Sequence, residues 1–545
     1  MRKRTLIFPI VFFISSFFIL YFSSGAVQSI RDNLYNSDIL FPFSLYRGIF
    51  QAGSHPDWIF GSNTPYLELF FGLILWLIAR GNIHLTLVFY AVFQPVFMVV
   101  CLLYLARCLL GKNWLLFSLV LIFSALPVIA FSMGVSRPLF FLFTWFVHMI
   151  TMGLALVALG LVIQVINTDQ VFSERVRIRL YLLCLLTVLA TTSDALFIFQ
   201  LTAPVIAVLA LMVILSIIPL KKAGVITLSL IFGTGLGQVL YKLPLLLGAN
   251  RVSLVGSFMS PNQAPLIDQL QLIAMKISNA WDGALLGWVI WSGFYLLCLL
   301  LALTFIWRWH RNERGKIRSR FFIILLFFPL QLTSNIASSL ISGNFELRYF
   351  MPLVYIPLFL GWPFLFMLIP WVVESLRGKR VLAVGLSLLG LAAVLWVVNL
   401  NSSREQHPNL ADYYPGLVAC VDDHSRELGL HRGIAQYWYA RYISILSKDN
   451  LMMVQEIHSM APFFYLNNSD GYEDDFDFVL AYSDAISMNR VDPANLVDRA
   501  AVIARFGEPA VSFNCDGVDM LVYNRENDQT FKRQFRLYMG FGNWK

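Results

Sequence analysis

Long runs of apolar residues recur along the whole chain and are separated by short polar segments. A bilayer core about 30 Å thick is crossed by about 20 helical residues, so runs of this length can span it. The charge-free runs lie at 5–30, 81–106, 113–136, 138–168, 195–220, 283–307, 321–345, 349–373 and 381–403. Shorter or interrupted candidates lie at 64–79, at 178–199 with Asp194, and at 223–247 with Lys242. The pattern predicts a polytopic α-helical membrane protein.

Basic residues gather in short loops, and these loops set the predicted orientation because Lys and Arg stay on the cytoplasmic side of a membrane. The clusters are Arg2–Arg4, Arg175–Arg179, Lys221–Lys222, Arg308–Arg320 and Arg377–Arg380. With all of them inside, the N-terminus is cytoplasmic and the chain after residue 403 is extracytoplasmic. That arrangement needs an odd number of spans, whereas the pattern offers twelve candidates. We therefore expect 11 or 13 transmembrane helices, with the misassigned or missing span between residues 64 and 137.

The chain divides into a transmembrane module, 1–403, and a hydrophilic tail, 404–545, which is predicted to be an extracytoplasmic soluble domain. In the tail, a helical stretch at 415–428 is mixed with strand-like runs at 476–482, 501–506 and 518–523. Such a mixture is typical of a small α/β domain.

Two of the six cysteines, Cys420 and Cys515, lie in the tail. Because the space outside the membrane is oxidising in most cells, we expect a disulfide between them. The other four cysteines lie in or next to apolar spans and are interpreted as small buried hydrophobic residues.

Composition agrees with a lipid environment and excludes several classes of function. Apolar residues make up 58% of the 545 positions, and charged residues only 13%. The net charge of +8 comes from loops predicted to face the cytoplasm, where anionic lipid accounts for it, so nucleic-acid binding is set aside. The sequence carries no Walker loop, no Cys-X-X-Cys, no clustered histidine site and no dinucleotide fingerprint. Chemistry on a soluble nucleotide is therefore not expected.

Candidate chemistry gathers in the loop 26–65, which follows a single span and is therefore predicted to be extracytoplasmic. It carries Asp32, Asp38, His55 and Asp57, and Glu68 follows it. A carboxylate at the mouth of a helix bundle can act as a general base on a hydroxyl or bind a divalent cation. The alternative is ordinary solvation, since loops are where charges belong in any membrane protein.

The order of features in this loop is distinctive. Ser37-Asp38 is followed by the amphipathic stretch Ile39–Ile49, by His55-Pro56, and by Thr64–Leu67 at the entry to the next apolar run. This order resembles the GT-C superfamily of polyprenyl-phosphate-dependent glycosyltransferases, in particular the protein mannosyltransferase and aminoarabinose transferase-like members. Their first external loop carries an Asp-Glu pair, a helix lying on the membrane and a His-Pro-Pro-Leu type segment. Here Ile39 replaces the Glu, and His55-Pro56 precedes Asp57 instead of leading into the span.

The resemblance, which covers this loop closely and the remaining chain only as architecture, implies roles for three residues. Asp38 would be the catalytic base that takes a proton from an acceptor hydroxyl while the lipid phosphate leaves, with inversion at the anomeric carbon. Asp57 would be a second acid or a metal contact, and His55 a phosphate or sugar contact. No cofactor is certain, and the need for a divalent metal stays open.

A second polar group follows the predicted span 321–345. Glu346, Arg348 and Tyr349 lie where the chain is expected on the extracytoplasmic side. The planar fork of Arg suits a phosphate, and an Arg-Tyr pair before a helix also resembles the lipid-phosphate site of GT-C proteins. The alternative is an interfacial anchor, because Arg and Tyr are favoured at the headgroup level.

Asp194 is the acid within a long apolar stretch, predicted near the extracytoplasmic face. An ionisable group at such depth is a functional hypothesis by default, so Asp194 is a candidate for the substrate cavity. The alternative is a cap on the following helix. His148 is interpreted as a lone polar group satisfied inside the bundle.

In the tail, Tyr437, Trp438 and Tyr439 stand in a row near Arg441. These rings are suited to stacking on a sugar, while core packing or contact with the membrane surface explains them equally well.

The sequence thus predicts a GT-C-like hexosyl or pentosyl transferase in a membrane, taken to be the bacterial inner (plasma) membrane. Its donor would be a polyprenyl-phosphate-linked sugar and its acceptor an extracytoplasmic glycan, lipid A or protein. The alternative is a non-enzymatic transporter or an assembly factor for envelope polysaccharide. The chain shows no clear repeated halves of the kind found in many transporters.

Overall fold

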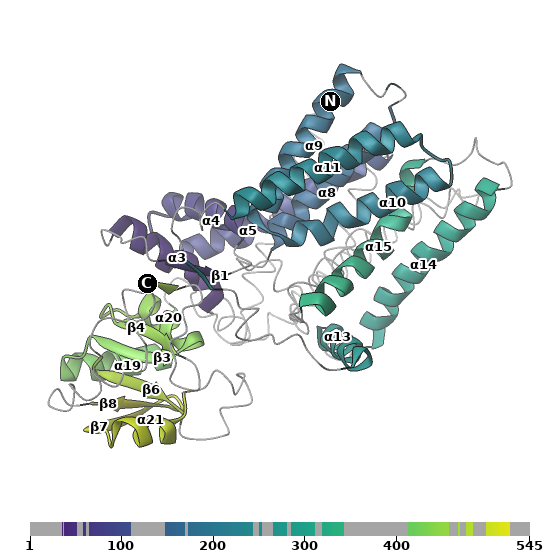
Figure 1. Ribbon diagram of the computed structural model, residues 1–545. Coiled ribbons are helices and arrows are strands. Elements are labelled where there is room, and N and C mark those ends of the chain that lie inside the picture. The colour runs from purple at the N-terminus through teal and green to yellow at the C-terminus, as the bar shows by residue number, and fades with distance from the viewer. Residues whose placement is uncertain are drawn as a thin grey trace, which may run out of the picture.

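A computed structural model describes most of the helical module and of the tail. The described residues are 35, 37–51, 58–61, 65–110, 148–168, 170, 173–242, 250–252, 265–280, 285–310, 319–342, 413–456, 467–468, 476–482 and 497–523. They form an elongated bundle of apolar helices and, beside one end of it, a smaller domain built on a β-sheet (Figure 1). This is the predicted fold class, a multi-helix membrane module followed by a mixed α/β domain.

Long apolar helices make up the bundle. They are α5 (Ile83–Leu110), α8 (Met149–Ile166), α9 (Glu174–Ser193), α10 (Ala203–Ile214), α11 (Leu220–Tyr241), α14 (Leu285–His310) and α15 (Ser319–Ser342). Five of the described helices, namely α5, α8, α9, α11 and α15, contain segments long and apolar enough to cross a membrane, so the chain is an integral membrane protein.

The predicted spans agree with these helices except at their ends. The run 195–220 forms a shorter helix, in which a π-helical turn, η2 (Ile198–Thr202), continues directly into α10, and this helix ends at Ile214. The described part of the run 138–168 forms a helix only from Met149. The candidate spans 5–30, 113–136, 349–373 and 381–403 lie outside the described residues.

Helices α9 and α11 share the most extensive contact among the described helices, and glycines allow their close approach. A Cβ atom at Gly233 would lie 2.9 Å from Cβ of Thr187, and one at Gly237 would lie 2.8 Å from Cβ of Thr191. This four-residue spacing of small residues is typical of close helix contacts in membranes. Because later residues of α11 meet later residues of α9, the two helices run parallel.

Helices α5 and α8 also run parallel. Gly153 of α8 lies against Phe97 of α5, and Gly160, two turns later, lies against Tyr104. The short connection from Ile166 to Glu174 then reverses the chain, so α8 and α9 are antiparallel.

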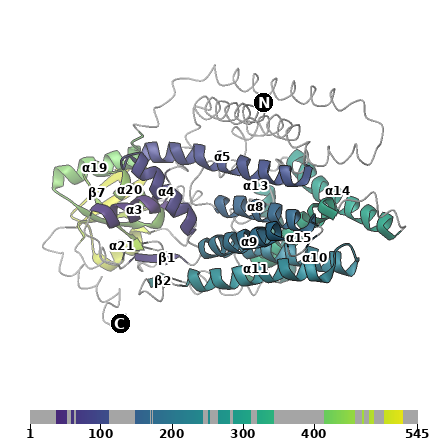
Figure 2. The same cartoon turned by 90° about the horizontal axis from the view of Figure 1, so that it is seen from above.

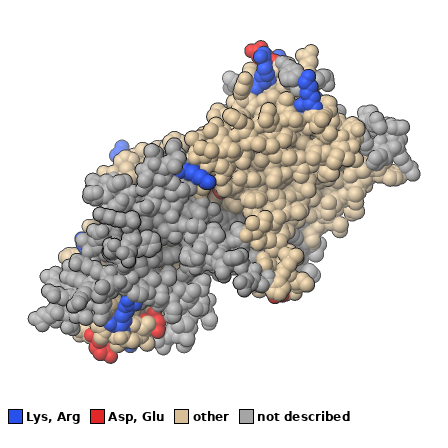
Figure 3. Space-filling model, viewed as in Figure 1, with Lys and Arg blue, Asp and Glu red and all other residues tan. Residues whose placement is uncertain are grey.

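The last turn of α8 and the first turns of α9 and α11 meet at one end of the bundle, which we call the basic end. There the Lys222 Nζ donates hydrogen bonds to the carbonyl oxygens of Ile166, at 3.1 Å, and Thr168, at 2.7 Å. Arg179 donates to the Thr168 hydroxyl at 3.0 Å. Figure 3 shows basic side chains at this end, against a bundle flank that is otherwise almost without charge. The opposite end, with His148, Ser193 and Tyr241, is called the domain end.

Helix α4 (Tyr66–Ile78) does not cross the bundle, although its apolar run was counted among the candidate spans. Its start is at the domain end, since the Leu67 amide donates to the Ser193 hydroxyl at 2.9 Å and Tyr66 contacts the ring of Tyr241. Its last residue connects through a turn to Ile83, where α5 also begins at the domain end. Removing this run from the twelve candidates leaves eleven, one of the two odd numbers expected, and because four of the eleven lie outside the described residues the count stays a prediction.

The domain near the C-terminus contains a five-stranded sheet in the order β4-β3-β6-β8-β7. Its elements are α19 (Gly416–Leu428), β3 (Arg432–Gln436), α20 (Tyr437–Leu446), β4 (Met452–Glu456), β6 (Phe478–Ala481), α21 (Arg499–Phe506), β7 (Val511–Cys515) and β8 (Val518–Val522). Strand β3 is parallel to β4 and β6, and β8 is antiparallel to β6 and β7.

One predicted strand of this domain is wrong. Residues 501–506 belong to α21, which begins after Asp498, whose carboxylate accepts hydrogen bonds from the amides of Ala500 and Ala501. This cap starts a helix and satisfies amides that a strand would pair with a neighbour. The runs 476–482 and 518–523 contain β6 and β8, as predicted.

Three distant segments meet in a small second sheet. Strand β1 (Trp58–Gly61) pairs with β2 (Asn250–Val252) in parallel and with β5 (Asn467–Asn468) in antiparallel orientation. Helix α13 (Leu266–Ala280) precedes α14. In the same first loop as β1, α3 (Ser37–Gln51) lies beside α4 and the C-terminal domain (Figures 1 and 2). The first predicted loop is therefore attached to the C-terminal domain at two places.

Candidate functional site

Asp38 lies in the first turn of α3, the helix formed by the amphipathic stretch of the first loop. The buried face of α3 includes Ile39, Leu40 and Phe43. Apolar burial therefore fixes the helix, while its N-terminal end favours a negatively charged side chain such as that of Asp38 through the helix dipole. Asp38 itself is partly buried.

A proline weakens the backbone hydrogen bonding of this same turn. Pro42 lies inside α3 and has no N–H to donate to the carbonyl oxygen of Asp38, four residues earlier. The turn that carries Asp38 therefore depends more than usual on contacts made from outside the helix.

Those contacts come from α20 of the C-terminal domain. The Tyr437 hydroxyl donates to Oδ1 of Asp38. Ser37 donates through its hydroxyl to the carbonyl oxygen of Tyr437 at 2.6 Å and to that of Trp438 at 3.0 Å. Arg441 donates from Nη1 to the Ser37 carbonyl oxygen at 3.0 Å. Residues 399 to 404 positions apart in the sequence thus meet at the start of α3.

The aromatic run of the tail therefore has two kinds of environment. Tyr437 and Arg441 are buried, and Arg441 lies over the rings of Phe41 and Tyr437. Tyr439 instead lies beside Tyr482, within the C-terminal domain. Of the alternatives raised by the sequence, packing explains Tyr437 and Tyr439.

Asp194 and His148 form a pair at the domain end of the bundle. Asp194 lies just after α9, and its Oδ2 is 2.7 Å from Nδ1 of His148, which precedes α8. Its Oδ1 accepts the Leu196 amide at 2.9 Å, so the capping role considered for Asp194 is observed. Both side chains are buried, with 1% of Asp194 and 4% of His148 exposed.

Glu68 is the third buried ionisable residue at this end, and its side chain is fully buried. Its Oε1 accepts the Ile150 amide at 3.3 Å, in the first turn of α8. Sequence reasoning grouped Glu68 with the first loop and did not connect it with His148. Glu68 and Asp194 lie near the ends of apolar runs on the same predicted side of the membrane, which is a signal for this cluster, whereas His148 lies inside the predicted run 138–168 and gives no such signal.

Several predicted site residues lie outside the described residues. They are Asp32, His55, Asp57, Glu346, Arg348 and Tyr349. The described part of the candidate site therefore consists of Asp38 with its partners from α20 and, separately, the pair of Asp194 and His148.

Cys420 and Cys515, the cysteines predicted to pair, are joined by a disulfide that links α19 to the end of β7. His424, one turn after Cys420, lies near both sulfurs, and these three form the group of potential metal ligands found among the described residues. A thiolate, not a disulfide sulfur, is the metal ligand, so the oxidised pair does not fit a metal ion.

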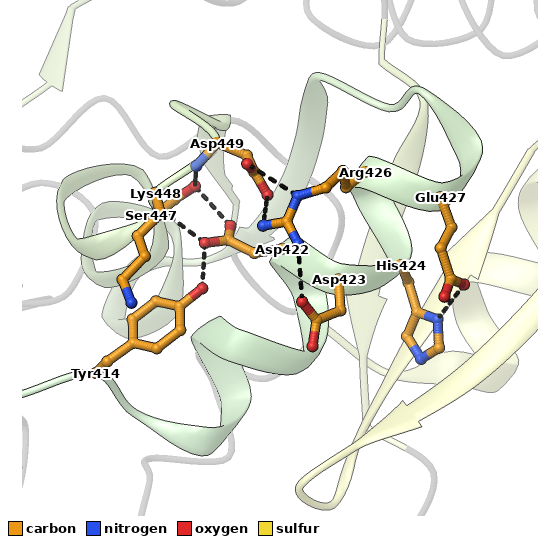
Figure 4. A network of polar contacts seen from close by, with 9 residues as sticks. All are labelled: Tyr414, Asp422, Asp423, His424, Arg426, Glu427, Ser447, Lys448 and Asp449. Atoms are coloured by element: carbon orange, nitrogen blue, oxygen red, sulfur yellow. Dashed lines mark hydrogen bonds and ion pairs between the residues drawn. The ribbon is translucent and has the colours of Figure 1, made fainter.

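A buried carboxylate that the sequence did not single out stabilises the loop after α20. Asp422 accepts hydrogen bonds from the Tyr414 hydroxyl at 2.5 Å, the Ser447 hydroxyl at 2.6 Å and the Lys448 amide at 2.8 Å (Figure 4). Burial, and then the hydrogen bond to Asp422, raises the pKa of Tyr414 above its usual range. Asp422 thereby fixes the C-terminal end of α20 relative to α19.

Comparison with known proteins gives a similarity in structure and none in sequence. No protein-family model matches the chain, and no curated protein matches it in sequence. Among solved structures, the chain is similar to the Archaeoglobus fulgidus oligosaccharyltransferase in complex with Zn and sulfate. The two are 10% identical, with a TM-score of 0.45 over 87% of this chain and 67% of the other. We transfer no residue role from this similarity.

Proposed function

We propose that this chain is a GT-C-type glycosyltransferase that moves a sugar from a polyprenyl-phosphate donor to an extracytoplasmic acceptor. The observation that carries the proposal is the placement of Asp38. It is a partly buried carboxylate in the first turn of the loop helix α3, where the C-terminal domain meets the membrane module. The sequence of the same loop resembles the GT-C first loop, in which an Asp stands at this point.

In the proposed reaction, the Asp38 carboxylate accepts the proton of the acceptor hydroxyl as the hydroxyl oxygen attacks the anomeric carbon. The bond from that carbon to the phosphate oxygen breaks, and the lipid phosphate leaves with the electron pair. A single displacement of this kind inverts the anomeric centre. A base held in hydrogen-bonding range of the attacking hydroxyl typically contributes about 10²- to 10⁴-fold to the rate.

Further roles are proposed from the sequence. Asp57 would be a second acid or metal contact, and His55 would contact phosphate or sugar. Glu346, Arg348 and Tyr349 would bind the donor phosphate, because a guanidinium can donate two parallel hydrogen bonds to it. The acceptor is proposed to be a lipid-linked glycan, lipid A or a protein.

We also propose that the domain end of the bundle and the domain 404–545 face away from the cytoplasm in the bacterial plasma membrane. The support is that Arg179 and Lys222 lie at the basic end, whereas the C-terminal domain lies beside the opposite end (Figure 1). Asp38 would then meet a lipid-linked donor at the outer surface of the membrane.

The test is sugar transfer from labelled polyprenyl-phosphate sugars by membranes that contain the full-length chain. Asp38→Asn removes the base and keeps the shape of the side chain, and we expect it to lower transfer about 10²- to 10⁴-fold. The matched control is Asp423→Asn, an exposed acid on α19, which we expect to retain the parent rate. Unchanged transfer by Asp38→Asn would contradict the catalytic role. Failure of the parent chain to transfer any sugar from the donor series would contradict the enzymatic assignment.

A further inference from the structure

The contact between α3 and α20 includes several directed hydrogen bonds in addition to apolar packing. The Ser37 hydroxyl, the Ser37 carbonyl oxygen and the Asp38 carboxylate each pair with a group on α20. All these groups belong to the first turn of α3. Farther along the helix, Arg47 donates to the carbonyl oxygen of Ile445 in α20 at a longer 3.5 Å, and apolar burial provides most of the contact.

We infer that the C-terminal domain positions the Asp38 carboxylate, with Tyr437 and Arg441 as the positioning residues. The inference rests on the proposed role of Asp38 and adds to it a role for the C-terminal domain. In this arrangement the domain acts on the reaction through the geometry of one side chain, by hydrogen bonds across the domain boundary.

Tyr437 orients the carboxylate itself. Its hydroxyl donates to Oδ1 of Asp38, and a donor at one oxygen restricts rotation of the carboxylate about its Cβ–Cγ bond. Tyr437 is in turn held in place, because it is buried and is the first residue of α20, immediately after β3. A base must lie within hydrogen-bonding range of the proton it takes, so this orientation bears directly on the rate.

Arg441 holds the backbone that carries Asp38. Its side chain is only 5% exposed, and its Nη1 donates to the carbonyl oxygen of Ser37 at 3.0 Å. The guanidinium also lies 5.3 Å from the centre of the Phe41 ring, so it contacts both ends of the first turn of α3.

Pro42 explains why the first turn needs this support. Because Pro42 cannot donate to the carbonyl oxygen of Asp38, the helix lacks one of the hydrogen bonds that would hold this turn. The bonds from α20 act on that turn. The C-terminal domain therefore determines the position of Asp38. The hydrogen bonds of Asp422 to the loop after α20 and the disulfide help to keep that domain rigid.

The test compares Tyr437→Phe with Tyr439→Phe in the full-length chain. Each substitution removes one tyrosine hydroxyl from the first turn of α20. The hydroxyl of Tyr437 bonds Asp38, whereas the ring of Tyr439 lies beside that of Tyr482 inside the C-terminal domain. We expect Tyr437→Phe to lower kcat for sugar transfer about 10- to 100-fold, the range for a hydrogen bond to a charged group. KM for the donor should change less than about twofold, because the donor-binding groups are untouched. Tyr439→Phe should keep the parent kcat.

Asp38→Asn, measured in the same preparation, separates this inference from the proposed function. If Asp38→Asn is inactive and Tyr437→Phe keeps the parent kcat, the positioning role is wrong and the proposed function stands. If Asp38→Asn is active, the proposed function itself fails. A rise in KM with unchanged kcat for Tyr437→Phe would also overturn the positioning role, since it would place Tyr437 in substrate binding.

A second measurement does not depend on activity. Arg441→Ala should increase hydrogen exchange of the backbone amides in residues 41–46, which donate within α3 except at Pro42, while the amides of α9 keep their protection. Exchange that stays at the parent level in residues 41–46 would show that α20 does not hold the start of α3. This outcome would overturn the inference whether or not the variant transfers sugar.

Discussion

Asp194 and Asp38 both stand next to apolar segments, and their surroundings differ in kind. Asp194 is buried at the domain end of the bundle, and both of its oxygens are used, one by His148 and one by the Leu196 amide. Asp38 is partly buried at a domain boundary, and its hydroxyl partner comes from a residue 399 positions later. Depth in an apolar segment therefore does not by itself make an acid a candidate for a functional role.

The difference separates a structural carboxylate from a candidate catalytic one. A buried acid whose oxygens are satisfied by a helix amide and an imidazole stabilises the junction of α8 and α9, and it has little capacity left for a substrate. An acid at the edge of the bundle, held by a neighbouring domain, keeps its orientation without being enclosed. The predictions below test this contrast.

The largest effect on stability should come from Asp194→Ala. It removes the buried carboxylate that pairs with His148 and accepts the Leu196 amide, and the loss of both buried hydrogen bonds costs about 3–5 kcal/mol. Thermal unfolding of the purified full-length protein in detergent measures the change. A variant as stable as the parent would contradict the structural assignment of Asp194.

A somewhat smaller effect is expected from Cys420→Ser, which opens the disulfide of the C-terminal domain. The two cysteines are 95 residues apart, and removal of a native disulfide that closes a long loop typically costs about 2–5 kcal/mol. Because this domain holds α3, we expect the variant to lose sugar transfer at a lower temperature than the parent. Equal temperature profiles for the two proteins would show that the stability of the C-terminal domain does not affect the site at Asp38.

The smallest effect concerns the interior of the bundle. Gly237→Ala places a Cβ 2.8 Å from Thr191 of α9, and we expect it to destabilise the protein by about 1–3 kcal/mol. The matched control is Gly235→Ala, two residues earlier on α11, where no atom lies within 4 Å of the added Cβ. Thermal unfolding should rank Gly235→Ala at or above the parent and Gly237→Ala below it. The reverse order would mean that α9 and α11 do not pack through Gly237.

The membrane-spanning helices could be predicted from the sequence because each depends on the apolar character of one continuous segment. About 20 apolar residues are needed to cross a bilayer wherever they occur, so α5, α9 and α15 were found from the pattern alone. Helix α4 could not be classified in this way. Its 13 residues are as apolar as those of a span. It does not cross, because its start at Tyr66 and Leu67 and the start of α5, which follows it through a turn, both lie at the domain end.

The partners of the candidate site could not be predicted, because they are distant in the sequence. Nothing local connects Asp38 with Tyr437, and the aromatic run at 437–439 is equally compatible with sugar stacking, membrane contact and packing. His148 and Asp194 were interpreted separately for the same reason. Their pairing depends on where α8 begins, which is Met149, eleven residues after the predicted start of that span at 138.

The central claim is that Asp38 acts chemically whereas Asp194 acts structurally, and one paired measurement tests it. Asp38→Asn and Asp194→Asn make the same change, and the asparagine at 194 keeps an oxygen for the Leu196 amide. Single-turnover transfer from a polyprenyl-phosphate sugar is measured per folded molecule in proteoliposomes. We predict a loss of about 10²-fold or more for Asp38→Asn and less than about tenfold for Asp194→Asn. A parent-like rate for Asp38→Asn, or a larger loss for Asp194→Asn, would contradict the claim.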